Sequence, residues 1–260
     1  MSGLAVAYVR RADLRRRLAL GPELVAGVVI AGAWLVLIVV SFRGLGPFSG
    51  SPSTPQMPGM YMPPGPGRSL PSTIVAGMPL WIVMCVAMMG PSALAGVRHT
   101  GLNSLAWRKK RAVLEYSAGY VTVWASFGVL VLVLGALVPT DGHWFAVGIA
   151  LAIAGLWQFS VFKRRALRDC HRATSLPLWG KKAELASLDF GLNNGSACLR
   201  SCWCLMVVMS LAPGSMVLWM TGLGMVITVE RLVERPRRVT RAIGVVCWLS
   251  LAIVIVVASL

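Results

Sequence analysis

The sequence is poor in charge, and above all in acidic charge. Only 13% of its 260 residues are charged, with 9 Asp and Glu against 25 Lys and Arg, while 57% are hydrophobic. A soluble domain carries about 25% charged and about 45–50% apolar residues. This composition excludes a water-soluble globular enzyme, a disordered protein and a nucleic-acid-binding module, so no nucleic-acid partner is expected. The net charge of +16 comes from basic blocks between long apolar runs, which are typical of topology signals in a protein that crosses the lipid bilayer repeatedly.

The motifs of several common chemistries are also absent. No Walker-type loop, Gly-x-Ser-x-Gly elbow or His-Glu-x-x-His sequence occurs, so phosphoryl transfer, serine hydrolysis and zincin chemistry lack their parts. Acidic residues near the membrane centre mark proton- and cation-coupled carriers. Here Glu115 and Glu230 lie at the ends of apolar runs among arginines, where we expect interfacial ion pairs. Their position argues against a conventional proton-driven carrier.

Six apolar stretches are long enough to be membrane-spanning helices, which need about 20 mostly apolar residues. They predict an all-α polytopic bundle of about six transmembrane helices, with a single membrane domain over residues 24–260 after a basic N-terminus at 1–23. The stretches are Leu24–Val40, Ile74–Val97, Ser117–Val138, Trp144–Phe162, Cys202–Val229 and Ala242–Leu260.

Basic residues orient these spans through the positive-inside rule. Five arginines at positions 10–17 place the N-terminus in the cytoplasm, and the expected location is the bacterial inner membrane. Segment 43–73, with eight prolines and six glycines, is then an external loop that cannot bury a core. Segment 163–200, with eight Lys and Arg, is a cytoplasmic loop in which we expect short amphipathic pieces on the lipid headgroups.

The stretch Cys202–Val229 is ambiguous in length. Its 28 residues make a helix of about 42 Å, long for one crossing of a roughly 30 Å core and short for two. Pro213 and Gly214 near its middle predict either a kink or a turn. We favour one long, tilted and kinked helix, with two half-length passes as the alternative.

Sulfur is the most prominent chemical feature, with 13 methionines and six cysteines. Thioethers are soft ligands that select Cu(I) over hard ions, although methionine is also a common packing residue in helices. The candidate thioethers form a cluster in the external loop, a group in the second span and an i, i+4 pair in the fifth stretch. They are Met57, Met60 and Met62; Met84, Met88 and Met89; and Met216 and Met220.

Thiols form a second candidate group on the predicted cytoplasmic side. Cys198 and Cys202 are one helical turn apart, so their sulfurs face the same way. Cys170 and His171, earlier in the same segment, could complete a four-ligand sulfur and nitrogen set. A reducing cytoplasm favours metal or redox use of these thiols over a structural disulfide, and small-residue packing is the other interpretation of Cys198 and Cys202.

Two segments resemble a bacterial family of predicted metal-binding integral membrane proteins whose mechanism is not established. Residues 87–91 resemble its Ala-Met-Met-x-Pro signature, and residues 198–206 resemble its Cys-x-Gly-Cys-Cys-Trp-x-Leu-Met motif. The resemblance covers roughly residues 74–235 and implies a membrane protein that binds metal. Ser201 stands where the family pattern has a cysteine, and Ala166 stands where an earlier cysteine is usual, so the implied cytoplasmic site has lost two thiols.

The sequence thus predicts an integral membrane protein that binds a soft metal ion, with copper as the expected ion. In this hypothesis the external methionines capture the ion, the helical methionines line a path, and the thiols receive it, with a soluble metal-handling or redox protein as a possible partner. Two alternatives stay open: a membrane subunit of a copper-dependent oxidoreductase, and a structural or partner-binding subunit without metal. Whether the chain is an enzyme, and in what oligomeric state it works, also stays open.

Overall fold

Every regular element in the computed structural model is an α-helix, within the residues that it describes, namely 22–42, 70–137, 143–172, 174–211, 216–232 and 236–259. This confirms the predicted all-α class. The helices are α2 (Pro22–Phe42), α3 (Leu70–Leu102), α4 (Lys109–Leu137), α5 (His143–Phe159), α6 (Val161–Asp169), α7 (Gly180–Leu211), α8 (Met216–Leu232) and α9 (Pro236–Ser259).

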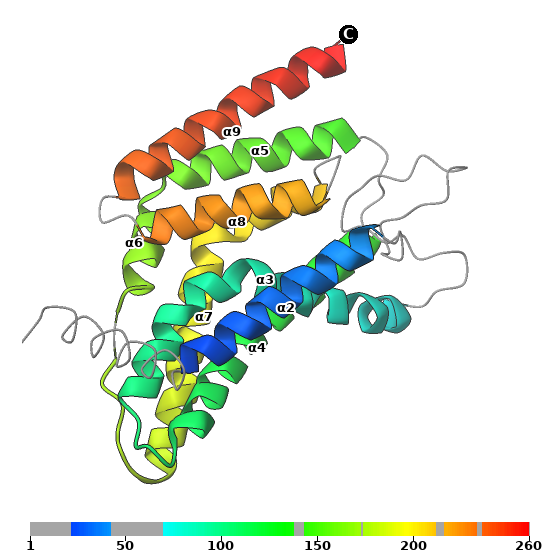
Figure 1. Ribbon diagram of the computed structural model, residues 1–260. Helices are drawn as coiled ribbons and strands as arrows, with labels where there is room; N and C mark the ends of the chain where they lie inside the picture. The colour runs from blue at the N-terminus through cyan, green and yellow to red at the C-terminus, as the bar shows by residue number, and fades with distance from the viewer. Residues whose placement is uncertain are drawn as a thin grey trace, which may run out of the picture.

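The helices form two groups, which α7 and α8 join: α7 contacts α5 of the second group, and α8 contacts α9 (Figure 1). In the first group α4 packs between α3 and α7, and α2 lies along α3. In the second group α5 pairs with α9. Helix α8 contacts α2, α3 and α7 as well as α9, so residues on α8 reach the interiors of both groups.

Three of the described helices are long and apolar enough to cross a membrane: Glu23–Phe42, Leu70–Leu102 and Lys109–Gly135. A fourth candidate is the pair formed by α5 and α6, which is bent by 68°. These four coincide with the first four predicted spans. The last predicted span corresponds to α9, whose apolar part is the shorter segment Val239–Ile255.

The stretch predicted as one kinked helix is divided between two separate helices. Helix α7 ends at Leu211 and α8 begins at Met216, and their axes run in clearly different directions in Figure 1. The predicted kink or turn at Pro213 and Gly214 falls between these two helices and lies outside the described residues. Among the described residues the stretch forms the end of α7 and nearly all of α8 rather than one continuous helix.

Segment 163–200, predicted as a loop with short amphipathic pieces, is mostly helical. It contains nearly all of α6 and the first two thirds of α7. The first part of α7 packs against α4, and a Cβ atom built on Gly191 would lie only 2.1 Å from the carbonyl oxygen of Tyr116. Small residues permit such close approach between helices in membranes. A polar sequence therefore forms a helix here because glycine lets it pack on its neighbour.

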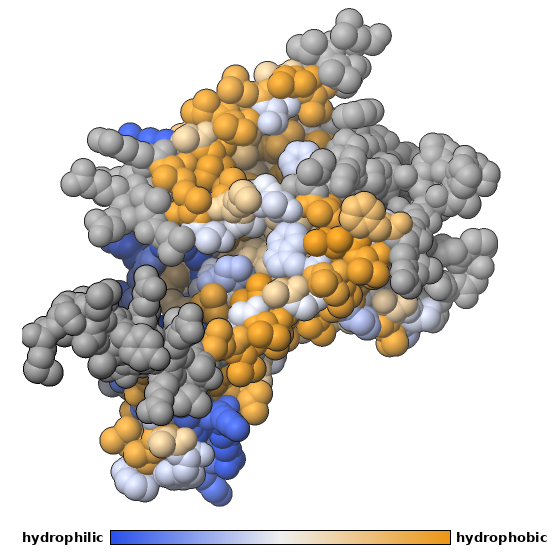
Figure 2. Space-filling model, viewed as in Figure 1, coloured by the Kyte–Doolittle hydropathy of each residue, from blue (hydrophilic) through white to orange (hydrophobic). Residues whose placement is uncertain are grey.

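The visible surface is largely apolar, with hydrophilic regions at its edges. Hydrophobic side chains cover much of the face in Figure 2, and hydrophilic side chains gather at the end where α4 and α7 begin and on the side where α6 lies. An ion pair between Arg111 and Glu184, with a nitrogen–oxygen distance of 2.8 Å, joins the two helices there. Exposed aliphatic side chains are numerous on α2, α5 and α9, where contiguous apolar surface of this kind indicates contact with lipid or protein.

Candidate metal site

The segment 87–91 of α3 owes its local structure to Pro91. Proline has no N–H group, so it cannot bond to the carbonyl oxygen four residues earlier in the helix, which is that of Ala87. Trp34 of α2 replaces the missing donor, with its Nε1 atom 3.0 Å from the Ala87 oxygen. This bond holds α2 against α3 and fixes the part of α3 that carries Met88 and Met89.

Cys198 of α7 is the centre of a buried group of polar and sulfur atoms. Its Sγ atom lies 3.8 Å from Sδ of Met89 and 3.0 Å from the hydroxyl of Tyr120. Cys198 and Met89 both have exposed fractions of 0%. Three helices thus meet at this thiol: α3 supplies Met89, α4 supplies Tyr120, and α7 supplies Cys198 itself.

Two further cysteines adjoin this contact. Cys202 follows Cys198 by one turn of α7, is buried, and its thiol donates to the Cys198 carbonyl oxygen at 3.1 Å. Cys85 precedes Met89 by one turn of α3 and is also buried. We call Met89, Cys198 and Cys202 the sulfur cluster.

The spacing within the sulfur cluster suits one shared metal ion. If metal–sulfur bonds are about 2.3 Å long, as in zinc thiolate sites, two donors of a trigonal site lie ~4 Å apart. The observed Met89–Cys198 separation of 3.8 Å is close to that value. Thiolates and thioethers together are a donor set that favours Cu(I) among biological metals.

Ser92 and Arg231 complete the polar surroundings of the cluster. The Ser92 hydroxyl lies 3.3 Å from the Tyr120 hydroxyl and donates to the carbonyl oxygen of Met89 at 2.7 Å. Arg231 near the end of α8 donates to the Ser92 carbonyl oxygen at 3.3 Å and to Sγ of Cys170 at 3.1 Å. A positive charge is therefore held beside the thiols.

The structure does not bring together the four predicted thiol and histidine ligands. His171 is exposed, whereas the Cys170 thiol faces Arg231. Burial raises the pKa of Cys170 to about 11, although the neighbouring Arg231 lowers it in part. Within the described ranges no group of three or more His, Cys, Asp or Glu side chains is arranged to hold a metal ion.

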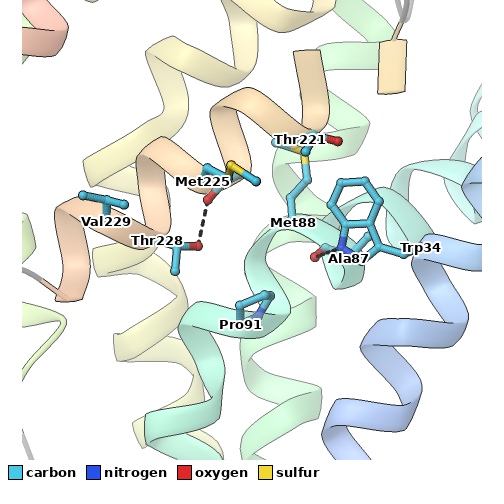
Figure 3. Close-up of a pocket in the computed structure, with 9 residues that line it drawn as sticks. Trp34, Ala87, Met88, Pro91, Thr221, Met225, Thr228 and Val229 are labelled. Atoms are coloured by element: carbon cyan, nitrogen blue, oxygen red, sulfur yellow. Dashed lines mark hydrogen bonds between the residues drawn. The ribbon is translucent and has the colours of Figure 1, made fainter. Parts of the chain in front are cut away.

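Adjacent methionines of α3 face different surroundings. Met89 lies in the sulfur cluster, whereas Met88 lines a pocket of about 380 Å³ between α2, α3 and α8 together with Met225 and Trp34. Figure 3 shows Met88 pointing toward α8, with the Thr228 hydroxyl bonded within that helix. The pocket is lined by two thioethers, those of Met88 and Met225.

The remaining predicted methionines divide into two sets. Met84 and Met220 are buried in the core, with exposed fractions of 0% and 1%. The side chain of Met216 and all of Met57, Met60 and Met62 lie outside the described residues.

The sequence alone did not assign several of these residues to the site. Its methionine neighbours leave Cys85 ambiguous, and the i, i+4 spacing to Met89 is the signal that could have assigned it. Tyr120 is open between a residue that faces a site and one that only packs. Arg231 lies in a basic block, which in a sequence indicates membrane topology. No local pattern indicated that its side chain contacts Ser92 and Cys170 in the interior.

These features define an all-helical protein whose bundle encloses a cluster of soft metal donors. A family model described as PpoB2, copper chaperone, matches residues 78–255, which include α4, α7, α8 and the part of α3 that carries the site. The chain belongs to this family. No curated protein and no solved structure matches the chain.

Proposed function

We propose that this protein is integrated in the membrane and handles copper by binding Cu(I) at the sulfur cluster. The observation that carries the proposal is the 3.8 Å contact between Met89 and Cys198, fully buried and next to a second thiol. Membership of a copper chaperone family supports copper as the ion. Burial excludes water and oxygen, both of which would promote loss or oxidation of Cu(I).

The methionines outside the cluster give the ion a route. The pocket lined by Met88 and Met225 supplies one pair of soft donors, and Met84 and Met220 are further buried thioethers of the core. In the proposal the segment with Met57, Met60 and Met62 captures the ion, and Cys198 and Cys202 receive it. Thioethers suit the transfer steps because they are neutral and bind Cu(I) without losing a proton.

Metal content of the purified protein tests the binding step. The full-length chain in mild detergent is given Cu(I) or Ag(I) anaerobically, and bound metal is counted by elemental mass spectrometry. We expect stoichiometric metal in the wild type and a large loss in Cys198→Ser and Met89→Leu. The matched controls are Cys247→Ser and Met78→Leu. Cys247 is also buried, and Met78 lies 11 residues before Met89, about 16 Å away along α3. Equal metal in all five proteins, or none in the wild type, overturns the proposal.

A cellular assay tests the transport step separately. Alanine at Met84, Met88 and Met89 together is expected to lower copper uptake or copper tolerance. If the phenotype is unchanged and the purified wild-type protein still binds metal, transport is excluded as its role. Metal storage or delivery then becomes the proposed role. A substrate-dependent optical or EPR signal from bound copper would instead favour the oxidoreductase alternative.

A further inference from the structure

Arg231 is a buried cation without a carboxylate partner. Only 7% of the residue is exposed, its Nε atom has no hydrogen-bond partner among the described residues, and no ion pair found there includes it. The adjacent Glu230 is paired with Lys163 at 2.8 Å. The three buried charges of this region therefore sum to +1, which is costly away from water.

The guanidinium of Arg231 lies next to groups that can become anions. It donates to Sγ of Cys170 at 3.1 Å and to the carbonyl oxygen of Ser92 at 3.3 Å. The Ser92 hydroxyl lies 3.3 Å from the hydroxyl of Tyr120, which is 3.0 Å from Sγ of Cys198 in the sulfur cluster. The excess positive charge thus lies where an anionic metal–thiolate complex would form.

The charge of such a complex depends on the valence of the metal. When Cu(I) binds two thiols and one thioether, the two thiols release two protons to solvent, and the complex carries +1 − 2 = −1. With Arg231 the sum is zero. A divalent ion with the same three ligands gives a neutral complex, so the charge of Arg231 stays unbalanced. Unbalanced charge costs most in a low-dielectric interior.

On the basis of the proposed function, we infer that Arg231 makes the sulfur cluster selective for monovalent soft cations, Cu(I) and its analogue Ag(I), over divalent thiophilic cations such as Cd(II). The side chain acts through charge rather than as a ligand. Its bonds to the Ser92 carbonyl oxygen and to Cys170 hold the guanidinium in place and leave the cluster sulfurs free for the metal.

Competition between Ag(I) and Cd(II) tests the inference. The full-length protein in detergent is equilibrated anaerobically with both ions over a range of ratios, and bound metals are counted by elemental mass spectrometry. Arg231→Met removes the charge, and Arg231→Lys retains it without the planar guanidinium. Arg200→Gln on α7 is the control, because Arg200 is exposed and its ion-pair distance to Asp169 is 3.8 Å.

We expect Arg231→Met to lower the Ag(I)-to-Cd(II) affinity ratio at least tenfold, equivalent to about 1.4 kcal/mol. Arg231→Lys should stay within about threefold of the wild type, since a factor of three is less than 1 kcal/mol. A structural role alone would weaken both ions equally and leave the ratio unchanged. If Arg231→Met does not stay folded by circular dichroism, Arg231→Gln replaces it, and the lysine variant still tests the role of charge.

The outcomes separate this inference from the proposed function. If the wild type binds Ag(I) stoichiometrically and the ratio is unchanged without the charge, the inference is overturned and the copper site stands. The inference is also overturned, and the copper site also stands, if Arg231→Lys loses as much selectivity as Arg231→Met. If the wild type binds neither Ag(I) nor Cu(I), both are overturned.

Discussion

The buried ion pair between Lys163 of α6 and Glu230 of α8 gives the sharpest stability prediction. Nζ of Lys163 lies 2.9 Å from Oε1 and 2.8 Å from Oε2 of Glu230, and the side chains are 1% and 2% exposed. The bend at Ser160, between α5 and α6, turns the start of α6 toward α8. The sequence had suggested an interfacial ion-pair partner for Glu230; the structure confirms an ion pair and places it in the interior.

The size of the effect follows from desolvation. Removing one partner leaves an uncompensated charge in the interior, which costs about 3–5 kcal/mol, whereas replacing both by apolar residues of similar volume is neutral or stabilising by about 1–4 kcal/mol. We therefore expect Glu230→Leu to destabilise the protein strongly, because Lys163 and Arg231 then remain as two buried positive charges. Lys163→Met should destabilise it less, because the remaining charges of Glu230 and Arg231 sum to zero although Glu230 loses its bonded partner. The double variant should be at least as stable as the wild type.

Chemical unfolding in detergent, followed by tryptophan fluorescence, measures the four corners of this double-mutant cycle. The ion pair between Arg98 and Glu23 is the comparison, because its side chains are 66% and 39% exposed, and exposed pairs contribute about 0–1 kcal/mol. Single replacements of Lys163 or Glu230 that cost no more than Glu23→Gln would refute the reasoning. A double variant as unstable as the singles would also refute it, because the loss would then not arise from an unpaired charge.

Three other changes have definite expected results. Gly191→Ala should destabilise the fold by about 1–3 kcal/mol, because its Cβ atom would lie 2.1 Å from a carbonyl oxygen of α4. Gly222→Ala is the control: no atom lies within 4 Å of its Cβ position, so this variant should not lower the unfolding midpoint. Trp34→Phe leaves the Ala87 carbonyl oxygen without its donor and should cost about 1–3 kcal/mol in the same unfolding assay. Because burial raises the pKa of Cys170 to about 11, its thiol stays protonated at neutral pH. The rate of its alkylation by iodoacetamide, measured by peptide mass spectrometry, should therefore increase with pH up to about pH 11. A rate that reaches a plateau near pH 8 would contradict this.

The sequence predicted helices better than it predicted side-chain partners. Length and hydropathy located the first four apolar segments. The first part of α7 was missed because its helix depends on close packing at Gly191, which is a tertiary contact. Helical periodicity likewise placed Cys198 and Cys202 on one face, but it did not indicate that Met89, more than 100 residues earlier, would meet them.

Met88 and Met89 show the limit of periodicity most clearly, and they also give a final test. Consecutive residues point about 100° apart around a helix with 3.6 residues per turn, so one thioether faces the pocket and the other faces the sulfur cluster. In the proposed function Met89 is a ligand, whereas Met88 belongs to the route that the ion follows. Their replacement should therefore affect different measurable quantities.

Met88→Leu should slow the loading of Ag(I), followed by rapid mixing, and leave the amount bound at equilibrium unchanged. Met89→Leu should lower the amount bound, because the cluster loses one of its three sulfurs. Both variants keep an apolar side chain of nearly the same volume, so packing costs less than about 1.5 kcal/mol in either case. If the two variants change rate and capacity in parallel, the two methionines do not have separate roles, and the division between route and site must be abandoned.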